Sequence, residues 1–240
     1  MNPDRPPVRL LASVTNESEA LLAVACGADI IDCKEPAAGA LGALPLATVA
    51  RIAGAVGAHC PVSATIGDLP AEPGSVSEAA GQVAETGVDF IKIGFFPGGD
   101  ARAAIVRLGL LRLGSRRLVG VLLADRAPDF KLIDDMARAG FAGVMLDTAD
   151  KSSGALPDCA SDVVLKSFIA ASRRHGMFAG LAGSLRLGHI PALLELGPDI
   201  LGFRGALCAG NRRMGGLDPD AIRAIRAAIP ATHAPEALAS

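Results

Sequence analysis

Lysine and aspartate residues at a regular spacing are the side chains of this 240-residue chain best suited to chemistry. Asp32 and Lys92 each lie five residues after a glycine, and Lys34 and Asp147 each lie seven residues after one. A neutral lysine amine attacks an aldehyde or ketone, and the iminium that forms stabilises an adjacent carbanion. Free in water, only about four lysines in ten thousand are neutral at pH 7, but burial and a second ammonium nearby increase that fraction. A carboxylate beside the amine could then move protons or orient one ammonium.

Small residues in the C-terminal part of the chain indicate a second feature of the site, a place to bind an anion. They lie at the ends of the last two apolar segments and are Gly183, Ser184, Gly205 and Ala206. In α/β barrels the corresponding loops commonly bind phosphate through backbone N–H groups. Arg204, Arg212 and Arg213 could add positive charge, although a tight turn alone would also require glycine. Ser63 and Asp68, around the third apolar segment, are candidate polar residues of the same substrate-binding site.

Eight short apolar or β-branched segments alternate with amphipathic helical patterns and must position these residues. The predicted strands span residues 8–14, 29–34, 61–66, 90–94, 117–124, 143–149, 178–184 and 200–206. Near-continuous apolar strands between helices indicate a parallel sheet covered by helices. Eight strand–helix units fit a closed (β/α)₈ TIM barrel, whereas a doubly wound sheet usually has about five or six strands. Ser75 and Glu78 match a capping box, which predicts that one helix begins there.

An internal repeat supports the closed barrel. Gly27, Gly87, Gly140 and Gly197 each end a predicted helix and precede an even-numbered strand, at intervals of 60, 53 and 57 residues. The repeating unit is therefore two strand–helix pairs. Glycine suits each position because a left-handed turn disfavours a Cβ. No composition break divides the chain, so we expect one catalytic barrel domain over residues 1–230 and a flexible tail over 231–240.

The glycine spacing also predicts where the charged residues lie. Strand side chains alternate with a period of two, so residues five and seven positions after a glycine share one side of the barrel wall. Charges cannot face the helix layer, so Lys34, Lys92, Asp147 and Arg204 are expected at the C-terminal mouth, where barrel enzymes hold their sites. Lys151 follows the sixth strand closely enough to join them. The alternative is that these are rim charges paired for stability, and an Asp147–Lys151 ion pair would look the same.

Composition and spacing exclude several other classes. Net charge is −2 and Trp and Tyr are absent, which argues against a nucleic-acid partner. No apolar run of about 18 residues and no signal peptide are visible, so we expect a cytoplasmic protein without a membrane partner. The odd number of scattered cysteines and the four scattered histidines predict neither disulfides nor a metal site. The apolar segment 105–113 suggests a homo-oligomer, although barrel packing explains it equally well.

Seven segments resemble the (5-formylfuran-3-yl)methyl phosphate synthase family. They are residues 27–34 (GADIIDCK), 35–43 (EPAAGALGA), 63–68 (SATIGD), 90–94 (FIKIG), 145–151 (MLDTADK), 181–184 (LAGS) and 202–206 (GFRGA). The resemblance runs from the first strand to Arg213. It implies a class I aldolase-like barrel and a lyase of methanofuran-type cofactor biosynthesis. Two molecules of glyceraldehyde 3-phosphate would be condensed to a phosphorylated furan aldehyde, with loss of phosphate and water.

The resemblance also implies roles for individual residues. Lys34 would form the Schiff base, Lys92 would be the principal proton acceptor, and Asp147 and Lys151 would assist the proton transfers. One triose would be held by its phosphate at the last two loops, and no metal, flavin or nucleotide cofactor is implied. Two departures concern the contacts of the second triose: Glu35 replaces the asparagine expected of archaeal members, and the loop after Lys151 is not basic.

Two other functions remain open from the sequence. Another Schiff-base aldolase, or a triose- or sugar-phosphate isomerase, would share Lys34 and the phosphate loops but would release no inorganic phosphate. A non-catalytic phosphometabolite-binding subunit would use Lys34 and Lys92 only to attract an anion. Borohydride trapping separates the enzymes from the binding subunit, and phosphate release separates the synthase from the other enzymes.

Overall fold

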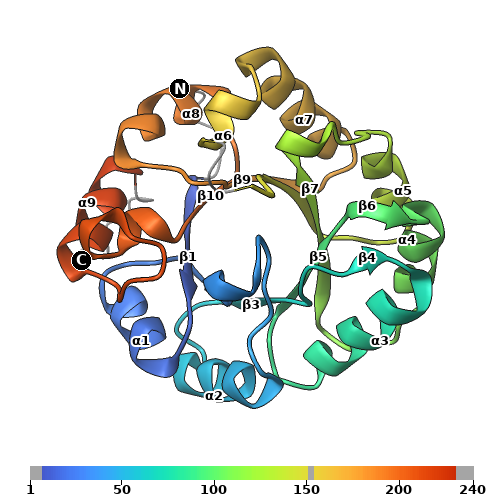
Figure 1. Cartoon of the computed structure of the whole chain (residues 1–240), viewed down its shortest axis with the longest axis horizontal. Coiled ribbons are helices and arrows are strands. Elements are labelled where there is room, and N and C mark those ends of the chain that lie inside the picture. The colour runs from blue at the N-terminus through green and yellow to red at the C-terminus, as the bar shows by residue number, and fades with distance from the viewer. Residues whose placement is uncertain (1–6, 151–153, 231–240) are drawn as a thin grey trace, which may run out of the picture.

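The computed structural model describes residues 7–150 and 154–230, and within these ranges eight parallel strands close into a barrel (Figure 1). The ring order is β1, β10, β9, β8, β7, β5, β3, β2. The strands are β1 (Arg9–Val14), β2 (Ile30–Cys33), β3 (Val62–Thr65), β5 (Phe90–Gly94), β7 (Arg117–Leu123), β8 (Gly143–Asp147), β9 (Phe178–Leu181) and β10 (Ile200–Phe203). Pairing of β1 with β10, with Arg9 opposite Ile200, closes the ring. The predicted (β/α)₈ TIM barrel is confirmed.

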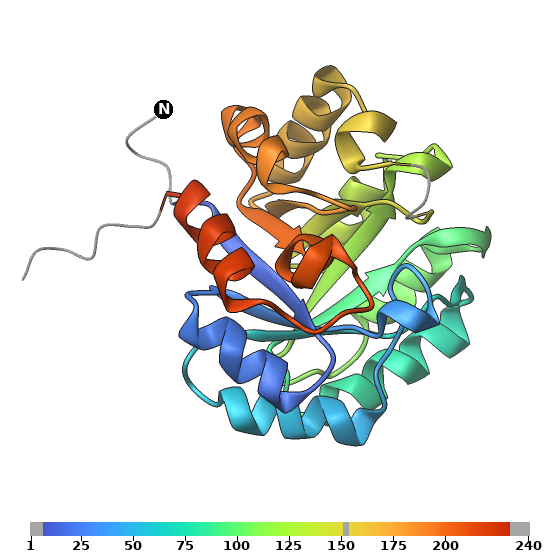
Figure 2. The same ribbon diagram turned by 60° about the vertical axis from the view of Figure 1, so that its left-hand side comes forward.

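Helices form a ring around the barrel, as Figures 1 and 2 show. They are α1 (Glu17–Ala25), α2 (Leu46–Val56), α3 (Pro73–Ala84), α4 (Ala101–Gly109), α5 (Leu132–Arg138), α6 (Leu156–Cys159), α7 (Asp162–Arg174), α8 (Ile190–Leu196) and α9 (Pro219–Ala228). Single 3-10 turns are η1 (Pro36–Ala38), η2 (Ala124–Arg126), η3 (Leu187–His189), η4 (Gly205–Leu207) and η5 (Ala209–Asn211). A short ribbon of β4 (Pro70–Ala71) and β6 (Phe96–Gly99) joins the loops after β3 and β5. None of the helices in the described ranges has the length and apolar character needed to cross a membrane.

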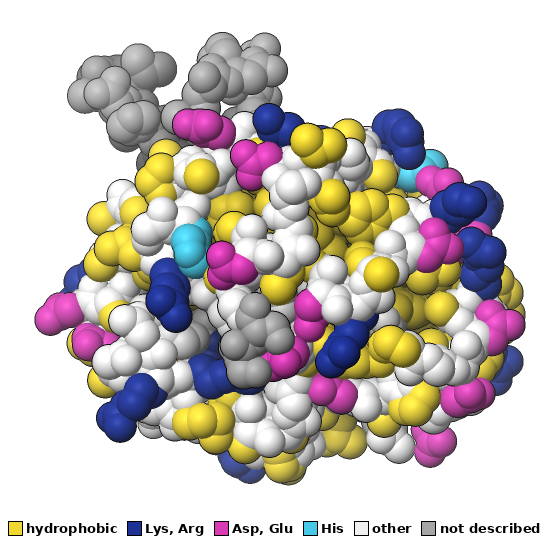
Figure 3. Space-filling view, turned by 45° about the horizontal axis from the view of Figure 1, so that its top comes forward, with side chains coloured by type: hydrophobic (Ala, Val, Ile, Leu, Met, Phe, Trp, Pro, Cys, Tyr) yellow, Lys and Arg dark blue, Asp and Glu magenta, His cyan; other side chains and the backbone are white. Residues whose placement is uncertain are grey.

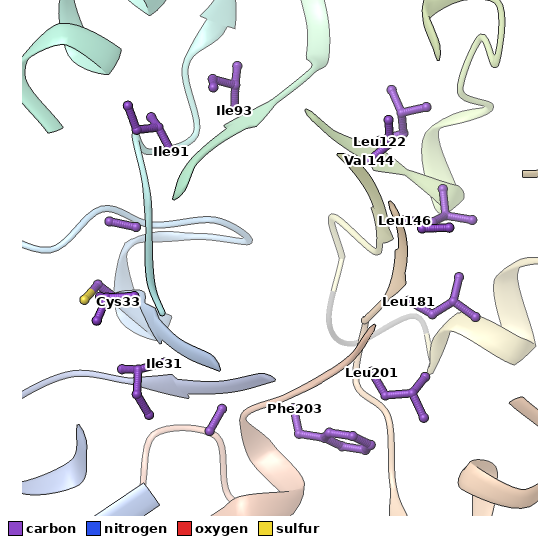
Figure 4. Packing of buried hydrophobic residues seen from close by; sticks show 14 of the residues in the cluster. Ile31, Cys33, Ile91, Ile93, Leu122, Val144, Leu146, Leu181, Leu201 and Phe203 are labelled. Atoms are coloured by element: carbon purple, nitrogen blue, oxygen red, sulfur yellow. The ribbon is translucent and has the colours of Figure 1, made fainter. Parts of the chain in front are cut away.

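Strand side chains alternate between the helix layer and the barrel interior. Figure 4 shows Ile31, Ile91 and Leu146 pointing away from the barrel centre, where they belong to the main hydrophobic core beneath the helices. Because side chains alternate along a strand, residues 32, 92 and 147 point inward. A smaller apolar cluster, which includes Val119 and Met145, fills the interior. The apolar cluster fills only part of the barrel interior, and polar side chains occupy the end at the C-terminal mouth.

The glycines of the repeat lie where the sequence predicts. Gly27, Gly87, Gly140 and Gly197 follow α1, α3, α5 and α8 and have φ of +89°, +88°, +81° and +71°. Each of them begins the turn into the next strand, and L side chains rarely adopt this backbone conformation.

The predicted capping box is wrong. Helix α3 begins at Pro73 and is preceded by Glu72, so Ser75 and Glu78 lie within the helix. Proline suits the first helical position because its φ is already helical and its missing N–H would have no partner there. The Ser75 hydroxyl donates instead to the Glu72 carbonyl oxygen, at 3.4 Å.

Candidate active site

A cavity of about 390 Å³ opens at the C-terminal mouth of the barrel. Small-molecule sites usually occupy roughly 300–1,000 Å³. The cavity is lined by Asp32, Lys92 and Asp147 from the strands and by Lys34, which directly follows β2. Residues from the segments after β8, β9 and β10 complete the lining. The structure thus brings together four of the five residues expected to take part in catalysis. Lys151 lies outside the described residues.

Lys92 and Asp32 form a buried ion pair on the barrel wall. The Lys92 Nζ lies 3.0 Å from each oxygen of Asp32, and the two residues are only 3% and 0% exposed. Hydroxyls of two serines donate to the same carboxylate, Ser63 Oγ to Oδ1 at 2.6 Å and Ser13 Oγ to Oδ2 at 3.0 Å. These donors offset the cost of burying the charge. Ser63, which is expected to bind substrate, is not among the residues that line the cavity, and its hydroxyl is directed at the Asp32 carboxylate.

Lys34 and Asp147 form a second pair across the mouth. Nζ of Lys34 lies 3.3 Å from Oδ2 of Asp147, and both side chains are buried. Lys34 directly follows β2 and Asp147 ends β8, and these two strands lie on opposite sides of the ring. The Thr148 backbone N–H donates to the other Asp147 oxygen at 2.8 Å. Each lysine therefore faces its own carboxylate, which can accept or return a proton beside the amine.

The loops after β9 and β10 supply backbone geometry suited to an anion. Gly183 has a φ of +109°, and a Cβ there would lie 3.0 Å from atoms of Thr148. The next residue, Ser184, is also left-handed, with φ +48°. Helix η4 begins at Gly205, so the N–H groups of Gly205 and Ala206 have no partner within the helix. All four expected small residues line the cavity.

Arg204 also lines the cavity, but its guanidinium is fully used within the protein. Its five N–H donors meet Glu19 Oε2 at 2.6 Å and Oε1 at 3.2 Å, and three backbone carbonyl oxygens at 3.0–3.1 Å. All five donors are thus used inside the protein, so Arg204, which was expected to bind phosphate, presents none of them to the cavity. Burial opposes ionisation of Glu19, but hydrogen bonds from Arg204 and Thr15 outweigh it and lower the pKa of this carboxyl.

Asp68 is not among the residues that line the cavity. Its carboxylate accepts the backbone N–H groups of Ala40, at 2.7 Å, and Leu41, at 2.6 Å. A Cβ on Gly39 would lie 2.1 Å from Asp68 Oδ2, so this close approach requires glycine. Asp68 thereby holds the loop after β2, in which Glu35 caps η1 with its own side chain. Asp68 therefore has a role in the structure of this loop, and its expected contact with substrate stays a prediction.

The cavity wall contains further polar residues. They are Arg186, His189, Asp158 and Asn211, which come from the segments that follow β8, β9 and β10 and include α6, η3 and η5. The spacing along strands gave no signal for them. Arg213, considered only as added charge, lines the cavity and is half-buried. Burial lowers the pKa of its guanidinium, and the nearby Asp147 carboxylate opposes that shift. Within the described ranges no three potential metal ligands cluster, and the cysteines are unpaired by disulfides.

Comparison with known sequences identifies relatives over most of the chain. Residues 10–226 match the family model described as 4-HFC-P synthase. A protein of Methylorubrum extorquens is 44% identical over 225 residues, which are 91% of this chain and 92% of the relative. The (5-formylfuran-3-yl)methyl phosphate synthase of Methanothermobacter thermautotrophicus is 36% identical over 228 residues, 90% of this chain and 97% of the relative. The Methanocaldococcus jannaschii protein of the same name is 35% identical over 229 residues, with the same coverage.

Comparison with solved structures shows the same fold at lower identity. Phosphoribosyl anthranilate isomerase from Thermus thermophilus superposes with a TM-score of 0.65 and 17% identity, covering 92% of this chain and 98% of its own. A 3-hexulose-6-phosphate synthase superposes with a TM-score of 0.62 and 17% identity, covering 93% of this chain and 100% of its own.

Proposed function

Because this chain belongs to the family of 4-HFC-P synthases, also named (5-formylfuran-3-yl)methyl phosphate synthases, we propose that it condenses two molecules of glyceraldehyde 3-phosphate. The product is (5-formylfuran-3-yl)methyl phosphate, and phosphate and water are lost. In this proposal the protein is a cytoplasmic lyase that supplies a methanofuran-type cofactor pathway and needs no cofactor, nucleic acid or membrane partner. The observation that carries the proposal is the pair of buried lysine–aspartate contacts facing one cavity.

The first half of the reaction uses Lys34. Its amine attacks the carbonyl of one triose phosphate and loses water to form a Schiff base, while Asp147, 3.3 Å away, moves the protons. The iminium then acts as an electron sink when a proton leaves the adjacent carbon. Lys92 first passes its ammonium proton to Asp32 and then, as a neutral amine, accepts that proton, while Asp32 keeps the amine in place. Lys151, just after β8 in sequence, assists the proton transfers.

The second half joins the two trioses. The carbanion adds to the carbonyl carbon of the second triose phosphate, and one phosphate and water leave as the ring closes and becomes aromatic. Hydrolysis of the iminium releases the product and restores the Lys34 amine. The other phosphate stays bound at the loops after β9 and β10, where the N–H groups of Gly205 and Ala206 begin η4. Backbone donors fixed before the substrate arrives bind an anion without reorganisation.

Borohydride trapping tests the nucleophile. Wild-type protein is incubated with glyceraldehyde 3-phosphate and borohydride, and the adduct is located by intact mass and peptide mapping. We expect a reduced adduct on Lys34 that disappears in Lys34→Ala but persists in Lys92→Ala, which should form no furan. Lys166→Ala, which removes an exposed lysine on α7, is the matched control. An adduct that persists in Lys34→Ala would disprove the assignment.

Phosphate release distinguishes the synthase from the two alternatives. The proposed reaction releases one inorganic phosphate for each furan formed, measured by a coupled phosphate assay and by furan absorbance. An aldolase or isomerase would trap at Lys34 but release no phosphate, and a binding subunit would do neither.

A further inference from the structure

The Glu19–Arg204 ion pair connects the start of α1 to the loop after β10. On one side Arg204 donates to both oxygens of Glu19 and to the Ser13 carbonyl oxygen. On the other side it donates to the carbonyl oxygens of Arg213, at 3.1 Å, and Gly215, at 3.0 Å. The turn from residue 213 to 215 is therefore held at both ends by one side chain. Its position relative to the barrel wall depends on Arg204, which in turn depends on Glu19.

Arg213 extends from the start of this turn into the cavity wall. One terminal nitrogen donates to the Gly39 carbonyl oxygen at 3.0 Å, which joins the loops after β10 and β2. Among described residues, this is the one hydrogen bond found for the Arg213 side chain. Its nitrogens that lack a protein partner are not buried. Its other N–H donors are therefore reached by solvent, and Arg213 is one of the residues that line the cavity. The two arginines thus differ: every N–H donor of Arg204 has a protein partner, whereas Arg213 keeps N–H donors that a ligand could use.

We propose that Arg213 binds the substrate phosphate and that Glu19 and Arg204 are positioning residues for it. The proposed function names the anion, on which this inference rests: a phosphate ester held beside Gly205 and Ala206. A guanidinium fork binds two phosphate oxygens at once, and burial strengthens such contacts. Arg213 would add directed charge to the backbone N–H groups of η4. Arg204 then acts through the backbone of Arg213, because its own donors stay within the protein.

Binding of inorganic phosphate, measured by isothermal titration calorimetry, tests the ligand role of Arg213. Arg213→Ala should weaken phosphate binding by about tenfold or more, since a charge-assisted hydrogen bond is lost. The matched control is Arg212→Ala, which removes the same charge from an exposed neighbour outside the cavity. In turnover, Arg213→Ala should raise KM strongly and change kcat little. Equal phosphate affinity in the two variants would overturn the assignment.

Glu19→Gln tests the positioning role by the direction of its effect. If Glu19 and Arg204 position the turn, the variant should weaken phosphate binding and raise KM while Lys34 still traps with borohydride. If Arg204 were itself the phosphate ligand, removing its carboxylate partner would strengthen binding. Unchanged or stronger binding would therefore contradict the positioning role. Should the variant fail to fold, Arg204→Lys replaces it, because a lysine keeps the charge but cannot make five fixed hydrogen bonds; retained affinity would again contradict the proposal.

These measurements remain informative if the proposed reaction is wrong. Phosphate titration requires no turnover and reports only on the anion site. Failure of borohydride trapping in wild-type protein would count against the Schiff base and leave the Arg213 result unchanged. Conversely, normal trapping with unaltered phosphate binding in Arg213→Ala would reject the anion assignment alone.

Discussion

At the scale of single residues, the site depends on how each buried charge is satisfied. Asp32 accepts from Lys92, Ser13 and Ser63, so its carboxylate has partners on both oxygens. Burying the pair is tolerable because these hydrogen bonds replace hydration. The same contacts hold the Lys92 amine at one place on the barrel wall. Stability and the proposed catalytic role of Lys92 therefore depend on the same atoms at this position.

Asp32→Asn should destabilise the protein strongly. The variant keeps the shape of the side chain but leaves the buried Lys92 ammonium without a carboxylate. We expect the free energy of unfolding to fall by about 3–5 kcal/mol, measured by urea denaturation. Asp220→Asn is the control, because it breaks an exposed pair with Arg223 and should change stability little. Equal stability of the two variants would show that the buried pair contributes nothing.

Glu19 should add a pH-dependent component to stability. Its pKa is lowered from 4.5 in the folded protein, so the unfolded chain takes up a proton there more readily. The stabilisation is fully present well above pH 4.5 and is lost as the pH falls through the lower folded-state pKa. Urea unfolding between pH 3 and 7 should therefore show a wild-type advantage over Glu19→Gln that shrinks at acid pH. An advantage that grew on acidification would contradict the sign.

At the scale of elements, turns and strand alternation position the chemistry. Glycine after a helix begins the turn that feeds an even-numbered strand, and the strand then places alternate residues inside. This local logic holds for Asp32, Lys92 and Asp147 without reference to the rest of the chain. Helix starts are less predictable, because the first turn of α3 uses Pro73 rather than the capping pattern two residues later.

Two glycine-to-alanine substitutions should have opposite effects on stability. Neither Gly140 nor Gly81 has any atom within 4 Å of an added Cβ. Gly140 has φ +81°, so alanine there should cost about 1–2 kcal/mol. Gly81 lies within α3, so alanine should stabilise the protein by about 0.5–1 kcal/mol. Thermal and urea unfolding of both variants measure the difference, and effects of the same sign would show that conformation at Gly140 is not decisive.

At the scale of the whole molecule, ring closure creates the site from distant positions. Lys34 and Asp147 are 113 residues apart, and Glu19 and Arg204 are 185 apart. Each contact requires the ring to be complete, since the partners come from different strands or from both ends of the chain. Charge has no such organisation on the face seen in Figure 3, where basic and acidic side chains intermingle.

Self-association remains a prediction at this scale. Within the apolar segment that suggested it, Ile105 and Leu108 are buried against the barrel, while Val106 and Leu110 are 63% and 71% exposed. We expect an oligomer by light scattering, and Val106→Lys with Leu110→Lys should dissociate it without unfolding the barrel. Val163→Lys on α7, where Val163 is 73% exposed, is the matched control. A wild-type monomer would contradict the prediction.

The sequence by itself determined the barrel and the inner-wall positions of Asp32, Lys34, Lys92 and Asp147. These features follow from local rules: a period of two along strands, helical patterns between them, and glycine where the backbone turns left-handed. Local rules act over a few residues, so they can be read from the chain in order.

Only the tertiary structure decided which groups are partners. In the folded molecule Arg204 pairs with Glu19, and Ser63 donates to Asp32. Asp68 accepts hydrogen bonds from the loop after β2, and Arg213 lines the cavity. A hydrogen bond is made within about 3 Å, and which donor comes that close to which acceptor depends on closure of the whole ring. Residue type and spacing therefore place a charge on a wall, and the packed molecule decides whether it is available to a substrate.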